Sequence, residues 1–578
     1  MEEQSSILTL SNEISICLCG AAGQGIQTVE RIVIHVLKRS GFHVFATKEY
    51  MSRVRGGVNS TTIRVSRKPV KAFKEKIDLL IPISQDAINH VKDRIRSDTF
   101  VLGDRKVFEK DLSIINQDYL IDVSFIDIAD ELGGKIYANT VAAGLLSGLL
   151  DANQEILQNY LTERFAEKGT DIVEKNIVAA MKGFDIGREL SKSGKLVINI
   201  PRHPEISEEV LLDGTQAVAL GAIAGGVNFI AFYPMSPSTG VPTFLAQQAH
   251  KFGIIVDQTE DEISAINKAL GAWYAGARAM LSTSGGGLAL MEEGLSLAGI
   301  IESPLVIHLG QRVAPATGMP TRTEQGDLEL VLYAGHGDFP RVLLSPGTIE
   351  DSFYLTHYAF NLADKYQVPV FILTDHYLID TYYNIPAPDL LPLKVEKHIT
   401  KTKSEYIRFQ FTENGISPRG IPGYGKGLVA VDSHVHTEEG HYTENFSIRR
   451  KMIDKRMKKL ELLEQESIAP ELLGPSDYST LIIGWGSTYH VINEARLHLN
   501  REDVAFLHFK QVYPLHKTII DFLKRATKLI IVENNATSQF GNLIKLKTGI
   551  HIHSRILKYN GLAFSVEELV ERLNKEIE

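Results

Sequence analysis

The sequence contains very little cysteine. Only Cys17 and Cys19 occur among its 578 residues. They lie two positions apart on a predicted strand, so their side chains point to the same face and a disulfide between them would be strained. So few cysteines are typical of a reducing, cytoplasmic compartment. Since an iron–sulfur cluster generally needs four protein ligands, any cluster that this protein uses must lie on another chain.

An excess of basic residues and a long apolar run are also missing. The chain has 61 Lys and Arg against 70 Asp and Glu, a formal charge of −9, which argues against a general nucleic-acid binder because phosphate binding needs a basic face. Met1–Ser11 is polar and acidic, without the apolar core of a signal peptide. Glycines interrupt the most apolar uncharged stretch, Ala217–Met235, so we expect a buried helix and strand there and no membrane span.

The length predicts several hydrophobic cores in a multidomain α/β protein. Residues 1–194 alternate between strand and helix patterns, and 195–381 predict a second, mostly parallel sheet. Residues 382–475 are less regular and rich in proline and histidine, and they end in a charged helix. A last α/β unit is predicted over 476–578. We find neither an internal repeat nor a low-complexity segment.

A glycine turn in the first unit has the geometry of an anion site. Gly20–Gly25 follows a predicted strand and precedes the predicted helix Thr28–Arg39, so free backbone N–H groups are available to an anion. No Lys-Ser/Thr follows, so the turn is neither a P-loop nor a dinucleotide fingerprint. A second loop, 50–57, carries Arg53 and Arg55. A structural turn and a solvated basic face are the alternatives, but two such loops in one domain favour an anionic ligand.

Two further features allow both a structural and a functional interpretation. Thr259 and Glu262 fit the S/T-x-x-E capping box at the start of the predicted helix Glu260–Ala277, which would make Glu262 a helix cap. Arg312 follows the predicted strand Leu305–His308, and strand ends in such sheets face ligand clefts. An arginine there can bind a carboxylate through two hydrogen bonds, although a surface arginine explains the position equally well.

A histidine-rich stretch, 434–441, raises the question of a metal site. Period-two alternation would place His434 and His436 on one side of a strand. The surrounding glycine and acidic residues indicate a loop instead, so the sequence favours no metal site here.

Taken together, these stretches resemble the 2-oxoacid:ferredoxin oxidoreductase family over nearly the whole chain. Tyr233-Pro-Met-Ser-Pro-Ser-Thr239 is similar to the family's Y-P-I-T-P-S-S turn beside the cofactor. Here Met235 replaces Ile, and Ser236 replaces the Thr that contacts the substrate but keeps the hydroxyl. Glu262–Gly271 is similar to the thiamine-enzyme helix whose Glu contacts the aminopyrimidine ring. Arg312 falls at the position of the family's arginine for the substrate carboxylate.

The resemblance extends to all four regions of the chain and implies their identities. It implies a γ-type domain at 1–194, a thiamine pyrimidine-binding domain at 195–381, a linker at 382–475 and a transketolase C-terminal-like domain at 476–578. The family-like stretches that support this are Gly23-Gln-Gly25, Arg55-Gly-Gly57, Ile63–Ser66, Ser282–Gly287, Pro320–Asp327, Ser417–Gly420, Lys455-Arg456, Gly484–Thr488, Tyr513-Pro514 and Val532–Asn535.

The resemblance also implies an activity, that of an α-type subunit with a fused γ-type domain. The expected reaction is the thiamine-diphosphate-dependent conversion of a 2-oxoacid and coenzyme A to acyl-CoA and CO₂, with electrons passed to ferredoxin. The diphosphate, its Mg²⁺ and the [4Fe–4S] cluster belong to a β subunit in this family, and no Gly-Asp-Gly…Asn metal loop occurs here. The implied catalytic residues are Glu262, Arg312 and Ser236, and the implied cofactor-binding residues are Tyr233, Pro234, Glu262, Gly23, Gly25 and Arg55.

The substrate is less closely defined by the resemblance. The fused γ–α order is most similar to 2-oxoglutarate members, so we expect 2-oxoglutarate, while pyruvate and branched-chain 2-oxoacids remain alternatives. An interpretation from another class is a non-catalytic partner subunit that binds coenzyme A or a dinucleotide. We expect no nucleic acid and no membrane among the partners.

Overall fold

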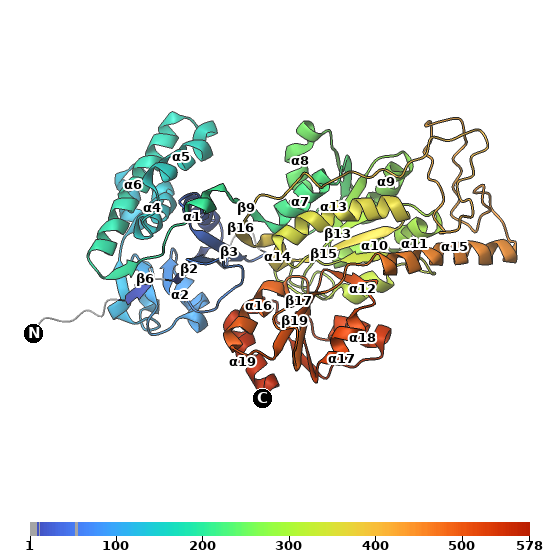
Figure 1. The fold of residues 1–578 in the computed structure, drawn as a ribbon. Helices are drawn as coiled ribbons and strands as arrows, with labels where there is room; N and C mark the ends of the chain where they lie inside the picture. Colours follow the sequence, from blue (N-terminus) through green and yellow to red (C-terminus); the bar gives the residue numbers. More distant parts are fainter. Residues whose placement is uncertain (1–7, 11, 53–55) are drawn as a thin grey trace, which may run out of the picture. The chain divides into compact units, whose positions relative to one another are not determined.

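The structure, a computed structural model, describes residues 8–10, 12–52 and 56–578. The chain forms two compact units (Figure 1). The first contains the residues up to 212 together with 380–387, and the second contains 213–379 and 388–578. Within these ranges, no helix is both long and apolar enough to cross a lipid bilayer.

The first unit is built on a mixed sheet with the strand order β7-β6-β5-β2-β4-β3-β16-β9. Its central strand β2 pairs with β5 in parallel and with β4 antiparallel, and its middle seven residues are all buried. The last strand to join in sequence, β16, comes from residues far along the chain and pairs with β3. The strands are β2 (Glu13–Ala21), β3 (His43–Glu49), β4 (Val58–Ser66), β5 (Leu79–Pro82), β6 (Phe100–Gly103), β7 (Leu120–Asp122), β9 (Val210–Asp213) and β16 (Tyr382–Ile385).

The helices of the first unit pack closely through glycine. A Cβ atom on Gly144 would lie 2.0 Å from the carbonyl oxygen of Ala180, and one on Gly183 would lie 2.0 Å from that of Val141. Only glycine permits such an approach of two helix backbones. These two helices are α4 (Ala138–Leu149) and α6 (Thr170–Lys192), and Figure 1 shows them grouped with α1 (Ile26–Arg39) and α5 (Gln154–Phe165).

The second unit contains a seven-stranded sheet with the order β11-β10-β12-β13-β15-β14-β20. Every pair in it is parallel except that between β14 and β20. All residues of β13 and β15 are buried, so helices cover both faces of the sheet. The strands are β10 (Phe229–Phe232), β11 (Ile255–Gln258), β12 (Ala279–Thr283), β13 (Leu305–Gln311), β14 (Val342–Leu344), β15 (Pro369–Asp375) and β20 (Gln511–Tyr513).

The helices around this sheet follow the predicted pattern with shifted ends. The predicted helix Glu260–Ala277 is α9, which is shorter by five residues in all, two at its start and three at its end. The glycine run Gly285–Gly287 begins the short helix α10, and Met291 separates α10 from α11. The helices are α7 (Gly214–Ala224), α8 (Gly240–Phe252), α9 (Glu262–Tyr274), α10 (Gly285–Leu290), α11 (Glu292–Ile300), α12 (Leu328–Tyr333), α13 (Ile349–Tyr366) and α14 (His376–Asp380).

A five-stranded sheet completes the second unit, with the order β17-β19-β18-β21-β22. The predicted α/β class is therefore confirmed in both units. The elements are α15 (Phe446–Gln465), β17 (Glu471–Leu473), β18 (Thr480–Trp485), α16 (Thr488–Leu499), β19 (Val504–Phe509), α17 (Ile519–Arg525), β21 (Lys528–Glu533), α18 (Gln539–Thr548), β22 (Ser554–Leu557) and α19 (Val566–Ile577).

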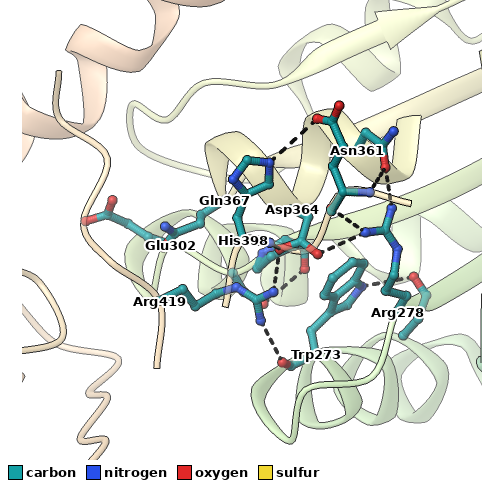
Figure 2. Close-up of polar contacts among 12 residues, drawn as sticks. Trp273, Arg278, Glu302, Asn361, Asp364, Gln367, His398 and Arg419 are labelled. Carbon is teal, nitrogen blue, oxygen red and sulfur yellow. Dashed lines mark hydrogen bonds and ion pairs between the residues drawn. The ribbon is translucent and has the colours of Figure 1, made fainter. Parts of the chain in front are cut away.

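Residues 386–445, all of them described, contain no helix or strand. Buried ion pairs hold this segment on the second unit. Arg419 donates to Asp364 Oδ1 at 2.5 Å, and Arg278 donates to Asp364 Oδ2 at 3.1 Å and to the carbonyl oxygen of Glu396 at 2.7 Å (Figure 2). The Asp364 side chain is fully buried, so these charge-assisted bonds replace the packing that regular structure would provide.

Candidate functional site

The turn after β10 is held in place by the end of β13. Arg312 Nη1 donates a hydrogen bond of 2.6 Å to the backbone carbonyl of Ser236. Within the turn, Ser238 Oγ donates to the carbonyl oxygen of Met235 at 2.8 Å. Two of the predicted site residues, Ser236 and Arg312, are thus in direct contact, and the Ser236 side chain is exposed at the surface of this unit.

Glycine in β13 lets the turn lie directly on the sheet. A Cβ atom on Gly310 would be 3.2 Å from Pro237 Cγ and 3.3 Å from the backbone nitrogen of Ser238. The predicted cofactor-binding residues Tyr233 and Pro234 lie on the outer side of the turn, where Tyr233 is 40% exposed. They are therefore available to a ligand or partner chain and do not form part of the core.

Glu262 is the first residue of α9 and does not take part in a capping box. The predicted pairing of Thr259 with Glu262 is wrong, because Asp261 is the N-cap and its Oδ1 accepts from the backbone N–H of Ser264 at 2.7 Å. The Thr259 hydroxyl donates instead to the carbonyl oxygen of Asp261. Glu262 is 3% exposed, and its Oε1 has no hydrogen-bond partner within the described ranges. An unsatisfied buried carboxyl oxygen is costly, so a bound group that hydrogen-bonds to Oε1 would be stabilised here.

The glycine run at the start of α10 makes room for two carboxyl groups. A Cβ atom on Gly287 would lie 2.1 Å from Thr283 Oγ1 and 3.0 Å from Glu262 Oε1. A Cβ atom on Gly285 would lie 2.3 Å from Asp327 Oδ1. The side chains of Glu262 and Asp327 therefore both approach this short helix closely, and any larger residue would displace them.

Asp327 lies beside these residues, although no sequence pattern gave it a role. It is buried, and its backbone N–H donates to Gln311 Oε1 at 3.1 Å, next to Arg312. Burial raises the pKa of Asp327 to about 6, while the nearby Arg312 guanidinium acts in the opposite direction. Burial and the charge of Asp327 raise the pKa of Glu324 to about 7. The only sequence signal was that both lie in the family-like stretch Pro320–Asp327.

Arg312 itself is 9% exposed. Burial lowers the pKa of its guanidinium from the usual value, and Asp327 partly reverses this. An arginine nevertheless stays charged at neutral pH. A buried guanidinium beside an exposed turn can bind an incoming carboxylate strongly, because little water competes for it.

The first unit contains a separate cavity at the predicted anion loop. Gly23 and Gly25 line a cavity of about 280 Å³ together with Lys48, Tyr50 and Thr61. Gly25 is the N-cap of α1 in the left-handed conformation with φ 79°, which glycine adopts without strain. The predicted partner of this loop, Arg55, lies outside the described residues.

The histidine-rich stretch forms local contacts. His436 is buried with its ring centroid 4.0 Å from that of Phe409, and its Nδ1 lies 2.9 Å from the carbonyl oxygen of His434. His434 Nδ1 lies 2.7 Å from Asp432. Across the described part of the chain, no group of three His, Cys, Asp or Glu side chains has the geometry to hold a metal ion.

Two family models match the chain. The first, described as pyruvate ferredoxin/flavodoxin oxidoreductase, matches residues 15–186. The second, described as pyruvate flavodoxin/ferredoxin oxidoreductase, thiamine diphosphate-binding, matches residues 220–455. The 2-oxoacid:ferredoxin oxidoreductase subunit alpha of a Sulfolobus species is 32% identical over 98% of this chain and 97% of its own length. The chain belongs to the 2-oxoacid:ferredoxin oxidoreductase family.

Other relatives of this α subunit are named for one substrate. The 2-oxoglutarate synthase subunit KorA of Methanothermobacter thermautotrophicus is 30% identical over 64% of this chain and 99% of its own length. A solved structure of 2-oxoglutarate:ferredoxin oxidoreductase from Magnetococcus marinus, with 2-oxoglutarate, coenzyme A and succinyl-CoA bound, has a TM-score of 0.90. It is 29% identical and covers 98% of this chain and 100% of its own. The family predicted from the motifs is confirmed, and the protein is an oxidoreductase subunit with a thiamine-diphosphate-binding domain.

Proposed function

We propose that this α subunit works with a β-type subunit in a thiamine-diphosphate-dependent 2-oxoacid:ferredoxin oxidoreductase. The reaction converts a 2-oxoacid and coenzyme A to acyl-CoA and CO₂, with two electrons passed to ferredoxin, and 2-oxoglutarate is the preferred substrate. The observation that carries the proposal is the buried Glu262 carboxyl group, whose Oε1 has no hydrogen-bond partner in the described part of the chain.

The residues around Glu262 fit the aminopyrimidine ring of the cofactor. Its Oε1 has no hydrogen-bond partner among the described residues and so can pair with a ring nitrogen, and Gly287 leaves room for the carboxyl group where a Cβ atom would come within 3.0 Å of it. The hydroxyl of Ser284 is a second buried polar group without a partner among the described residues. When bound, thiamine diphosphate supplies the electron sink for loss of CO₂ from a 2-oxoacid. In this proposal Glu262 holds and releases a proton at Oε1, as a general acid–base group.

The substrate end of the site is formed by Arg312 and Ser236. Arg312 binds the carboxylate of the 2-oxoacid, and the Ser236 hydroxyl donates to an oxygen of the same substrate. Their contact at 2.6 Å leaves the remaining guanidinium N–H groups for the substrate. Binding by a preorganised pair requires little rearrangement and so favours affinity.

The proposal assigns both metal centres, Mg²⁺ and the [4Fe–4S] cluster, to the β subunit. Cys17 and Cys19 are buried free thiols, and burial raises the pKa of both, so they remain protonated. The [4Fe–4S] cluster is therefore expected on the partner. The proposal places Mg²⁺ and the diphosphate group there as well, because the family resemblance implies it.

Coenzyme A is proposed to bind at the first unit's cavity. Gly23 and Gly25 line it together with Lys48, whose ammonium group lies 3.7 Å from Glu30 Oε1. Arg55, outside the described residues, is the second phosphate contact that this proposal assigns. Arg55→Ala should raise the KM for coenzyme A and leave 2-oxoacid decarboxylation unchanged. Equal effects on both half-reactions would indicate a folding role instead.

The choice of 2-oxoglutarate rests on the fused domain order and is supported by the names of the relatives. KorA is called a 2-oxoglutarate synthase subunit, and the Magnetococcus marinus protein was solved with 2-oxoglutarate bound. Pyruvate and branched-chain 2-oxoacids are the alternatives within the family.

The test is copurification with a β-type subunit of the same family. The complex is analysed for thiamine diphosphate, Mg²⁺ and iron, and then screened with 2-oxoglutarate, pyruvate and a branched-chain 2-oxoacid in the presence of coenzyme A and a dye acceptor. We expect bound cofactor and the highest kcat/KM with 2-oxoglutarate. A complex that binds no cofactor and oxidises no 2-oxoacid would instead support the non-catalytic partner subunit.

A further inference from the structure

Three polar side chains form a buried chain across the parallel sheet. His308 of β13 is fully buried, and its Nδ1 lies 2.9 Å from Ser282 Oγ of β12. Its Nε2 lies 2.8 Å from Thr374 Oγ1 of β15. Ser282 Oγ also donates to the carbonyl oxygen of Ser238, at 3.0 Å, in the turn after β10. This hydrogen-bond chain therefore runs from Thr374 in β15, through His308 and Ser282, to Ser238 in the turn that carries Ser236.

The direction of this hydrogen-bond chain follows from the number of protons. The Ser238 carbonyl can only accept, so it takes the single hydroxyl proton of Ser282. Ser282 Oγ must then accept from His308, which requires the proton on Nδ1. His308 Nε2 is left as an acceptor and takes the hydroxyl proton of Thr374. The competing bond from Thr374 to the Leu309 carbonyl is long, at 3.4 Å. The neutral Nδ1–H tautomer therefore uses the shortest contacts, since the Nε2–H form would turn the Ser282 hydroxyl away from Ser238 and the Thr374 hydroxyl toward Leu309.

The surroundings keep the imidazole neutral. Burial lowers the pKa of His308 to about 3, and no charged group contributes to that shift. Protonation of His308 would place a second ring proton on Nε2, facing the hydroxyl of Thr374. The hydrogen bond between these two groups would then have to reverse its direction. The chain is therefore a permanent structural connection at neutral pH.

The chain reaches both sides of Arg312. On one side it ends at Ser238, two residues from the carbonyl that Arg312 holds. On the other side the backbone carbonyl of Thr374 accepts from Gln311 Nε2 at 3.2 Å, and Gln311 Oε1 accepts from the backbone N–H of Asp327. The turn, through Ser282, and the loop bearing Asp327, through Gln311, are thus both connected by hydrogen bonds to β13 and β15.

We propose that His308 is a positioning residue, which through Ser282 sets the turn that carries Ser236 and so the orientation of Arg312 toward the substrate carboxylate. The role in substrate binding rests on the proposed function, but the positioning of the turn does not. Gly310 supports this role, because a Cβ atom there would lie only 3.2 Å from Pro237 Cγ and 3.3 Å from the backbone nitrogen of Ser238, so the turn packs on β13 with little room to shift.

The test uses the end of the chain, because replacing His308 itself can unfold the sheet. Thr374→Val keeps the shape and removes the hydroxyl, while Thr374→Ser keeps the hydroxyl and restores the bond. Ser282→Ala breaks the chain next to the turn. Thr356→Val is the matched control, because it removes the hydroxyl of an equally buried threonine, which donates to the Ser352 carbonyl oxygen at 2.7 Å in α13.

The first readout needs no activity. In the purified full-length chain, amide hydrogen–deuterium exchange of 233–239 is measured by mass spectrometry. Loss of one buried hydrogen bond should speed exchange about three- to tenfold in Thr374→Val and Ser282→Ala. Thr374→Ser should match the wild type, and Thr356→Val should leave this peptide unchanged. Unchanged exchange in Thr374→Val, or the same increase in Thr356→Val, would overturn the proposal.

The second readout is kinetic and uses the assembled complex. Thr374→Val should raise the KM for the 2-oxoacid about three- to tenfold and change kcat less than about twofold, because a misplaced carboxylate site weakens ground-state and transition-state binding alike. Faster exchange without a change in KM would overturn the role in substrate binding. If the wild-type complex oxidises no 2-oxoacid, the proposed function fails, whereas the exchange experiment still decides whether His308 positions the turn.

Discussion

Arg312 donates a hydrogen bond of 2.6 Å to the backbone carbonyl of Ser236, 76 positions earlier in the chain. The guanidinium is buried and has one contact fixed by the protein, so its orientation is set before any substrate arrives. Because this contact uses a backbone carbonyl, it does not depend on the replacement of the family's Thr by Ser236. The Ser236 hydroxyl remains free to take the role proposed for it.

Arg312 is therefore the first position to test. Arg312→Ala should weaken transition-state binding, calculated from the ratio of kcat/KM values for the preferred 2-oxoacid, by about 2–5 kcal/mol if the ion pair with the substrate is desolvated. Arg312→Lys keeps the charge but loses the planar pair of donors, so we expect an intermediate loss. Steady-state kinetics of the complex provide the measurement. An unchanged kcat/KM in Arg312→Ala would reject the assignment.

Glu262 can now be separated from helix capping, because Asp261 is the cap. Glu262→Gln should leave the complex folded and able to bind thiamine diphosphate, yet slow turnover about 10²–10⁴-fold. Asp261→Ala is the matched control, and it should lower stability by about 0.5–2 kcal/mol without a comparable loss of rate. The deciding measurement is proton exchange at C2 of the bound cofactor. Equal exchange rates in wild type and Glu262→Gln would remove its catalytic role.

Asp327 should make stability depend on pH in a defined direction. Burial raises its pKa from 3.8 to about 6, so the folded chain binds this proton more tightly than the unfolded chain. Its contribution to stability is therefore complete below about pH 4 and is lost as the pH rises toward about 6. Asp327→Asn should be more stable than wild type above that range, by up to about 3 kcal/mol, with no difference below it. Denaturant unfolding at both ends of the range measures this. A variant less stable at neutral pH would mean that attraction to Arg312 outweighs burial.

The ion pairs of Asp364 should be important for stability. Asp364→Asn leaves the guanidinium groups of Arg278 and Arg419 buried without their counterion, which should cost about 3–5 kcal/mol in unfolding free energy. Asp454→Asn is the control, because its pair with Arg450 is largely exposed at 3.8 Å and should contribute less than about 1 kcal/mol. Chemical denaturation of the two variants gives the comparison. Equal losses would show that the buried cluster in Figure 2 is not a major anchor.

The α subunit purified alone should contain no iron and show no oxidoreductase activity. Two cysteines are too few for a cluster. Iron and sulfide analysis of the isolated chain checks this, with the assembled complex as the positive control. Stoichiometric iron and sulfide in the isolated chain would contradict it.

The sequence by itself determined the local elements and the ends of the strands that carry the site. The apolar run Ile14–Cys19 lies within β2, and the predicted helix Thr28–Arg39 lies within α1. The placement of Arg312 beyond a buried strand was also correct. Such features depend on periodicity over a few residues, which a single sequence displays directly.

Only the tertiary structure decided how distant segments combine. β16 joins the sheet of the first unit and β20 joins the seven-stranded sheet, although each is short and far from its partners in sequence. Local pattern favoured a capping box at Glu262, but the backbone enters α9 so that Asp261 is the cap and Glu262 is left with an unpartnered oxygen. The bond between His308 and Thr374 spans 66 positions. Such contacts depend on which strands become neighbours, and that is set by the packing of the whole domain, because no local pattern specifies the partner.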